Sequence, residues 1–266
     1  MAYQELALAA ETVWATVTVE AEAFNVHAVT APEDKLEVLK VRVAVPPEGV
    51  IFCYEQELQN YILKEHKTKK VKNPYGDMYL LPETKNKIAV ISNFGFGAPA
   101  IAVIFEELIS IGVKKFISIG TAGTIQKGLK HGDIVICAKA IRDEGTSYHY
   151  LKPSKYAYAS GKMIQKIKDS LNKLKQKYIV GSSWTIDAMF RETPEEVKHY
   201  QKMGITTVDM EAATFFAIGK YRKAEAGVIF TISDSLVDKN WVAQFHNKDT
   251  YKGLEALYKV AIDVLS

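Results

Sequence analysis

Two carboxylates in the sequence follow apolar runs of strand length. Glu211 comes directly after the run 206–209 and before a helix-compatible run, and Asp234 follows the run 227–233. Small molecules bind at the carboxyl ends of the strands in open α/β sheets. There a carboxylate can accept hydrogen bonds from two sugar hydroxyls, or it can supply a proton to a leaving group. We therefore expect Glu211 and Asp234 to lie in one small-molecule site, although helix capping would also explain an acidic residue at either position.

Turns rich in glycine or polar residues follow three other apolar runs. They are residues 92–97, 120–123 and 184–187. Glycine leaves backbone N–H groups open to an anion or a sugar, and a helix that starts nearby adds partial positive charge. Tight turns also use glycine for geometric reasons, so each turn alone is weak evidence. Several such turns at one edge of a sheet predict a binding site there.

Apolar runs of strand length alternate with amphipathic stretches of helical length from Pro46 onward. This alternation predicts an α/β domain over residues 46–266, a three-layer α/β/α sandwich around a mixed, largely parallel sheet. Residues 1–45 differ in character and form an N-terminal segment to which the sequence assigns no role. The expected strands are 50–54, 87–92, 115–119, 133–138, 178–182, 206–209 and 227–233, and the expected helices are 56–64, 99–111, 156–175, 193–203, 212–223 and 252–265.

The composition bounds the class of protein. With 266 residues, of which 48% are hydrophobic, the chain can bury a full core. Its 34 basic and 31 acidic residues give a net charge of only +3, so nucleic acid is not an expected partner. There is no apolar run long enough for a membrane span and no signal-peptide pattern. Cys53 and Cys137 lie in apolar runs and read as reduced thiols, so we expect a cytoplasmic protein. The histidines lack metal-site spacing, so no metal is expected.

Five motifs occur in an order that matches a known superfamily. They are 93–99 (NFGFGAP), 119–123 with 132–135 (IGTAG and GDIV), 142–147 (RDEGTS), 208–213 (VDMEAA) and 233–234 (SD). In this order they resemble the nucleoside phosphorylases and nucleosidases, a superfamily that includes hexameric purine nucleoside phosphorylases and uridine phosphorylases. The resemblance implies cleavage of the N-glycosidic bond of a nucleoside. It also implies a homo-oligomer, commonly a hexamer built from dimers, that needs no cofactor beyond inorganic phosphate as co-substrate.

The resemblance gives the two carboxylates separate roles. Glu211 matches the residue that binds the ribose 2′ and 3′ hydroxyls, and Met210 the residue that packs under the sugar. Asp234 matches the residue that protonates N7 of a departing purine or hydrogen-bonds to it, so the implied substrate is a purine nucleoside.

Other matched positions would surround the base and the sugar. Trp184 aligns with an aromatic residue that stacks on the base, although a lone tryptophan is as often a core residue. Asp187 belongs to the same turn, and Arg191 next to it is a candidate for the edge of the base. Phe96 resembles a residue of the loop that lines the sugar and anion site, and Gly123, in the glycine-rich turn 120–123, is a candidate substrate-binding residue.

The phosphate site both matches the family and departs from it. Thr121 matches a hydroxyl residue that contacts phosphate, Gly95 lies in the loop that lines the anion site, and Lys72 loosely matches a cationic ligand donated across a dimer interface. Two arginine ligands are missing, because Ser118 stands at one position and residues 55–59 replace the loop that carries the other. The predicted reaction is still phosphorolysis, which gives ribose 1-phosphate and the free base.

Two alternatives stay open. In the related nucleosidases a glutamate after the first strand activates water, and residues 54–58 resemble that segment with Glu57 in the position of the base. This alternative predicts a nucleoside hydrolase, but Glu57 could equally lie on the exposed face of the helix 56–64. The other alternative is a non-catalytic nucleoside-binding protein that has lost its anion site.

Overall fold

The computed structural model describes residues 45–266 except residues 74, 238–241 and 244–246. The predicted N-terminal segment 1–45 thus lies, apart from its last residue, outside the described part. The strands of the described part belong to one twisted sheet, with the order β11-β10-β6-β8-β9-β5-β1-β4-β3-β2 and with β7 beside β6. The strands are β1 Gly49–Cys53, β2 Lys69–Asn73, β3 Gly76–Leu80, β4 Ile88–Ser92, β5 Lys115–Thr124, β6 Ile134–Asp143, β7 Tyr156–Tyr158, β8 Tyr178–Ile186, β9 Thr207–Asp209, β10 Glu225–Ser235 and β11 Val242–Ala243.

The sheet is mixed, as predicted. The strands β4, β1, β5 and β10 are successive parallel neighbours, and β6, β8 and β9 form a second parallel set. The other pairings among the described strands are antiparallel, including the central pair β6 and β10. Because β1, β4, β5 and β10 run the same way, their carboxyl ends meet at one edge of the sheet.

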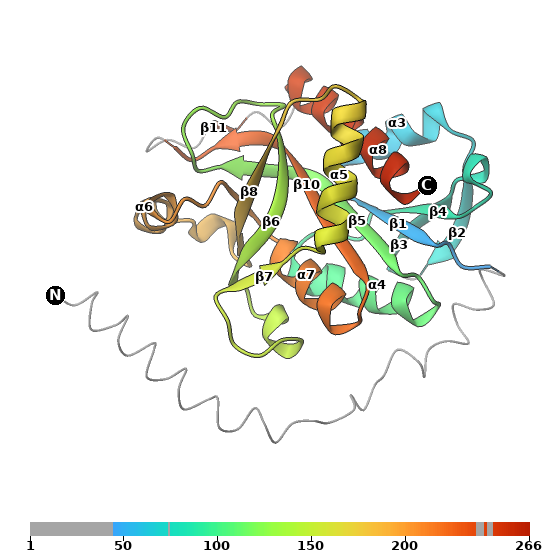
Figure 1. Cartoon of the computed structure of the whole chain (residues 1–266), viewed down its shortest axis with the longest axis horizontal. Helices are drawn as coiled ribbons and strands as arrows, with labels where there is room; N and C mark the ends of the chain where they lie inside the picture. Colours follow the sequence, from blue (N-terminus) through green and yellow to red (C-terminus); the bar gives the residue numbers. More distant parts are fainter. Residues whose placement is uncertain (1–44, 74, 238–241, 244–246) are drawn as a thin grey trace.

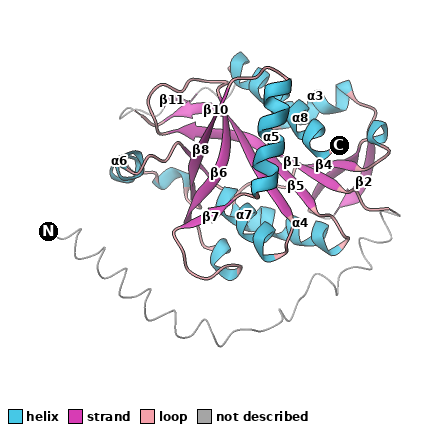
Figure 2. Cartoon of the chain, in the orientation of Figure 1, coloured by secondary structure: helices cyan, strands magenta, loops and turns pink. Residues whose placement is uncertain are grey.

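Helices cover both faces of the sheet, which confirms the predicted three-layer sandwich (Figures 1 and 2). Strand β1 shows why its sequence is apolar throughout: Val50 and Phe52 pack towards α4 and α7, and Ile51 and Cys53 pack towards α3, α5 and α8. The helices are α3 Gln56–Glu65, α4 Ala98–Ser110, α5 Gly161–Lys173, α6 Pro194–Lys202, α7 Ala212–Tyr221 and α8 Lys248–Leu265, and the short 3₁₀ turns are η2 Pro82–Thr84, η3 Thr146–His149 and η4 Met189–Arg191.

Two local predictions differ from the structure. The hairpin of β2 and β3 was not expected, because the Lys-rich run in β2 lacks the apolar character of a strand; it pairs at the edge of the sheet, where charged residues are tolerated. The expected helix 156–175 is wrong in its first residues. Tyr156–Tyr158 pairs with β6 as β7, and the hydroxyl of Ser160 then accepts the Met163 N–H and starts α5.

No helix in the described ranges is long and apolar enough to cross a membrane. Cys53 and Cys137 are both buried and free.

Candidate active site

A cavity of about 370 Å³ lies where the carboxyl ends of the parallel strands meet. Both carboxylates singled out in the sequence, Glu211 and Asp234, line it. The cavity is therefore the site that the sequence predicts at this edge. The cavity is also lined by Tyr54, Glu55, Phe96, Gly120, Thr121, Gly123, Met189, Phe190, Glu192, Asp209, Met210 and Ser233.

Glu211 is held at the turn between β9 and α7. Its Oε1 accepts a hydrogen bond from the Gly97 N–H at 2.5 Å. Gly97 has a φ of 92°, a conformation that favours glycine, so the loop before α4 can present this N–H only with that backbone. Burial, and then the neighbouring Asp209, raise the pKa of Glu211 to about 8. Glu211 thus carries a carboxyl that is poised to bind hydroxyl groups in the cavity.

Asp209, and not Glu211, satisfies the N-terminus of α7. Its Oδ2 accepts the N–H groups of Glu211 at 2.8 Å and of Ala212 at 2.6 Å, whereas the Glu211 side chain makes no capping bond. Its Oδ1 accepts hydrogen bonds from the hydroxyls of Ser183 and Thr185 on β8. The capping explanation of Glu211 is therefore not needed, because a neighbouring carboxylate already does that work.

The raised pKa of Glu211 leads to a prediction about stability. Between the ordinary value of 4.5 and about 8, the folded chain holds a proton that the unfolded chain has released, so the free energy of unfolding falls as pH rises through this window. Glu211→Gln has no such titration. From pH 5 to pH 8 the wild type should lose roughly 3 to 4 kcal/mol more stability than the variant, since this range covers most of the interval between the two pKa values and one unit corresponds to about 1.4 kcal/mol. Urea unfolding of both proteins at the two pH values measures this, and parallel losses would contradict it.

Ser233 and Asp234 both line the cavity although they are adjacent in β10. Successive side chains of a strand normally point to opposite faces. Here the register of β10 against β5 shifts between Ile232 and Asp234, and such irregularities turn side chains towards sites. The Ser233 hydroxyl donates to Asp234 Oδ1 at 2.7 Å. This irregularity gives the site a buried carboxyl with a hydroxyl beside it.

Gly123 lies against the Asp234 carboxyl. A Cβ at this position would come within 2.7 Å of Leu236 Cδ1 and 2.9 Å of Asp234 Oδ2. Gly123→Ala should therefore push Asp234 from its place and cost about 1–3 kcal/mol of stability, as overpacking usually does. Thermal unfolding and base release from a nucleoside check this together. A variant with unchanged stability and activity would show that the strand gives way easily.

The acidic residue that follows β1 into the cavity is Glu55, so the assignment of Glu57 is corrected. Helix α3 starts at Gln56, which leaves Glu55 at the turn and puts Glu57 in the exposed first turn, beside Tyr61 and outside the cavity. Glu55 Oε1 accepts the Thr121 N–H at 2.9 Å, and burial raises the pKa of Glu55. The predicted start of this helix, residue 56, agrees with the structure; the error was to choose the glutamate inside the helix and not the one directly before it.

Trp184 is a core residue and does not stack on a base in this cavity. It is fully buried, its indole N–H donates to Asp143 Oδ2 at 2.8 Å, and its ring lies 4.5 Å from that of Tyr200. The strand alternation explains the error: Ser183 and Thr185 point to Asp209 beside the site, so Trp184 points the other way.

The turn after β8 contributes residues other than those expected. Asp187 is exposed and accepts the Gly145 N–H at 2.9 Å, and Arg191 is also exposed; neither lines the cavity. Met189, Phe190 and Glu192 line it instead. Glu192 was missed because its position just before helix α6 reads as an ordinary solvated loop. Burial, and then Asp234 and Glu196, raise the pKa of Glu192 to about 7.

Of the predicted loop and phosphate-binding residues, some line the cavity and others do not. Phe96 lines the cavity and is 68% exposed at its mouth, and Thr121 and Met210 also line it. Gly95 is exposed and does not line it, because the loop presents Phe96 and the Gly97 N–H to the site instead. Lys72 lies opposite Asp77 in the backbone register of the β2–β3 hairpin, and its side chain lies outside the described part of the structure.

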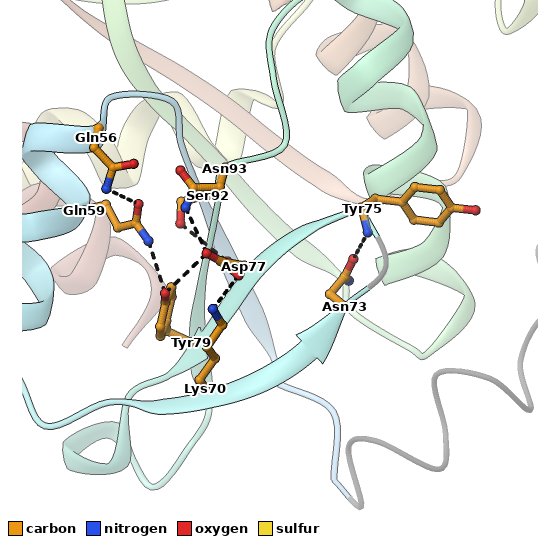
Figure 3. A network of polar contacts seen from close by, with 9 residues as sticks. All are labelled: Gln56, Gln59, Lys70, Asn73, Tyr75, Asp77, Tyr79, Ser92 and Asn93. Carbon is orange, nitrogen blue, oxygen red and sulfur yellow. Dashed lines mark hydrogen bonds and ion pairs between the residues drawn. The ribbon is translucent and has the colours of Figure 1, made fainter.

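A polar network beside the site joins helix α3 to the loop before α4 (Figure 3). Gln59 of α3 donates to the Tyr79 hydroxyl at 3.1 Å, and Tyr79 donates to Asp77 at 3.5 Å. Asp77 also accepts from the Asn93 amide at 2.8 Å and pairs with Lys70 at 2.7 Å. The network thus ties the helix that follows Glu55 to the loop that precedes Gly97.

The cavity is acidic. Among its described lining residues there are carboxyl groups but no lysine, arginine or histidine. Ser118, at the position where the resemblance expects an arginine, is buried and shares a hydrogen bond of 3.2 Å with the Tyr54 hydroxyl. In the ranges that the structure describes there is no cluster of three metal-ligating side chains. The carboxyl groups are Glu55, Glu192, Asp209, Glu211 and Asp234.

Comparisons with known proteins found a matching family model and similar curated proteins. The model of the phosphorylase superfamily matches residues 49–266. A guanosine phosphorylase from Halorubrum lacusprofundi is 31% identical over 56% of this chain and 62% of its own length. A DeoD-type purine nucleoside phosphorylase from Caldanaerobacter subterraneus subsp. tengcongensis is 31% identical over 68% of this chain and 77% of its own length.

Two solved structures have a similar fold. A purine nucleoside phosphorylase from Toxoplasma gondii gives a TM-score of 0.73 at 21% identity, over 83% of this chain and 90% of that one. An AMP nucleosidase from Bacteroides thetaiotaomicron gives 0.72 at 20% identity, over 89% and 96%. The same fold is thus found in a phosphorylase and in a nucleosidase, so the nucleophile must be inferred from the site.

Proposed function

The chain belongs to the phosphorylase superfamily, and from this premise we propose that it cleaves the N-glycosidic bond of a purine nucleoside by phosphorolysis, giving ribose 1-phosphate and the free base. The observation that carries the proposal is the meeting of Glu211 and Asp234 in one cavity at the carboxyl ends of the strands. The names of the relatives, a guanosine phosphorylase and a purine nucleoside phosphorylase, support the reaction and the purine base.

Glu211 acts on the ribose. Cleavage passes through an oxocarbenium-like sugar, and hydrogen bonds to the sugar hydroxyls that strengthen in this state lower the barrier. Fixed by Gly97, the Glu211 carboxyl has one oxygen, Oε2, left for the 2′ and 3′ hydroxyls, and Oε1 can accept a second bond. Met210 beside it packs under the sugar ring.

Asp234 acts on the base. A departing purine anion needs a proton at N7, and a buried carboxyl can supply it. The Ser233 hydroxyl holds this carboxyl in one orientation through its bond to Oδ1. The apolar side chains of Phe96, Met189 and Phe190 form the remaining wall against the flat faces of the base.

The co-substrate is inorganic phosphate, bound at the glycine-rich turn of β5 near Thr121, with no other cofactor. We also propose a homo-oligomer built from dimers, in which a neighbouring copy covers the cavity mouth. This proposal is supported by Phe96 and Phe190, which are 68% and 87% exposed there. In this oligomer Lys72 of one copy would contact the phosphate bound by its neighbour. We also propose a cytoplasmic location, which the two free buried thiols favour.

Hydrolysis is the second candidate function, and one observation favours it. The Glu55 carboxyl takes the Thr121 N–H, a backbone donor that the proposed phosphate would use. If Glu55 is ionised it could act as the base for an attacking water, the role first considered for Glu57.

A panel of nucleosides tests the substrate class. Inosine, guanosine, adenosine and uridine are incubated with the protein and phosphate, and base release is followed by chromatography. We expect release from the purine nucleosides and little from uridine. Faster release from uridine would overturn the purine assignment, and no release from any nucleoside would favour a binding protein.

A further inference from the structure

Glu55 occupies an anion-binding position in the cavity. Its Oε1 accepts the Thr121 N–H at 2.9 Å, on the turn where we place the phosphate. Its Oε2 is buried and has no hydrogen-bond partner among the described residues. A buried polar atom without a partner is costly, and it indicates a group that binds a ligand. The open oxygen therefore belongs to a place where a substrate atom is expected.

The described ionisable groups around Glu55 are acidic groups and include no base. Cys53, the last residue of β1, and Tyr54 precede Glu55. Glu57 follows it on α3, Thr121 faces it from β5, and Glu211 approaches it from the start of α7. None of these groups is a cation. Burial favours the neutral form of Glu55, and Glu57 adds to this. An ionised Glu55 would repel a phosphate anion at the same turn.

A neutral carboxyl at this position would have the opposite effect. Its Oε1 would still accept the Thr121 N–H, and the protonated Oε2 would become a hydrogen-bond donor. A phosphate oxygen is a strong acceptor for such a donor. The missing arginines, at Ser118 and in residues 55–59, make a donor of this kind useful because no described cation lines the cavity.

We propose that Glu55 is a phosphate-binding residue that works as a neutral acid, with Oε1 on the Thr121 N–H and the Oε2 hydroxyl donating to the phosphate. In its ionised form the same residue excludes phosphate. The protonation state of Glu55 thus controls access of the co-substrate. This inference rests on the proposed phosphorolysis.

The test compares wild type with Glu55→Gln, whose amide keeps an oxygen for Thr121 and an N–H donor for phosphate but carries no charge. The KM for phosphate is measured from pH 5.5 to 8.5 at saturating inosine. Phosphate ionises identically in both assays, so the ratio of the two KM values isolates Glu55. We expect the wild-type KM to rise with pH relative to that of Glu55→Gln and to exceed it at least tenfold at pH 8.5. Glu195→Gln, in the exposed first turn of α6 and outside the cavity, should follow the wild type.

Other outcomes overturn the proposal. A constant KM ratio across the pH range would show that the charge of Glu55 does not govern phosphate binding. Loss of base release in Glu55→Gln by 100-fold or more, with or without phosphate, would make Glu55 a general base for water. Failure of phosphorolysis itself looks different, because base release by the wild type would then not depend on phosphate. The shift in Tm that phosphate causes at pH 6 and pH 8 gives a second readout and checks that the variant folds.

Discussion

Glu211→Ala is expected to lower kcat/KM for a purine nucleoside about 30- to 1,000-fold, with a normal thermal unfolding curve. The loss corresponds to about 2–4 kcal/mol, the range for removing two buried hydrogen bonds that strengthen in the transition state. Both kcat and kcat/KM should fall, because the contacts strengthen as the sugar becomes an oxocarbenium ion.

Two variants sharpen this test. Glu195→Ala removes an exposed glutamate from the first turn of α6 and should leave activity unchanged. A 2′,3′-dideoxynucleoside lacks the hydroxyls, so wild type and Glu211→Ala should cleave it at similar rates. If the variant lost as much activity on this substrate as on the nucleoside, Glu211 would not act through the ribose hydroxyls.

Asp234→Asn is expected to lower kcat for inosine by about 10²- to 10⁴-fold, the usual contribution of a general acid. Asparagine keeps the shape and the possible bond from Ser233, but it supplies no proton to N7. A substrate whose base leaves without that proton provides the control. With 7-methylguanosine, already positively charged at the imidazole ring, the variant should lose little.

Equal losses on inosine and 7-methylguanosine would contradict the role of Asp234 as the purine acid. In that case the Asp234 carboxyl would stabilise the strand irregularity between Ile232 and Asp234 and would not transfer a proton. Stopped assays with both substrates at one pH are sufficient.

The layers of the fold could be predicted from the sequence because strands buried on both faces read as continuous apolar runs. Val50 to Cys53 in β1 is an example, since alternate side chains enter the two cores. The β2–β3 hairpin could not be predicted in this way. Its lysines lie at an exposed edge, and its pairing is set by neighbouring strands.

Some residues of the site could be predicted from the sequence and others could not. Glu211, Asp234, Thr121 and Gly123 were found because a residue at the end of a strand reaches the cavity whichever way the rest of the strand faces. Residues whose side depends on a one-residue phase were not. Trp184 points to the core because Ser183 and Thr185 on either side of it face Asp209, and Glu57 points to solvent because it lies inside α3, two residues after Glu55.

The most direct test of the central claim is the dependence of base release on phosphate. Phosphate-free protein is incubated with inosine or guanosine, with and without about 10 mM phosphate, a concentration above the usual range of KM values. The sugar product is identified by its mass. Phosphorolysis predicts that base release needs phosphate and yields ribose 1-phosphate in equal amount. Release at the same rate without phosphate, with free ribose as the product, would contradict it and establish hydrolysis.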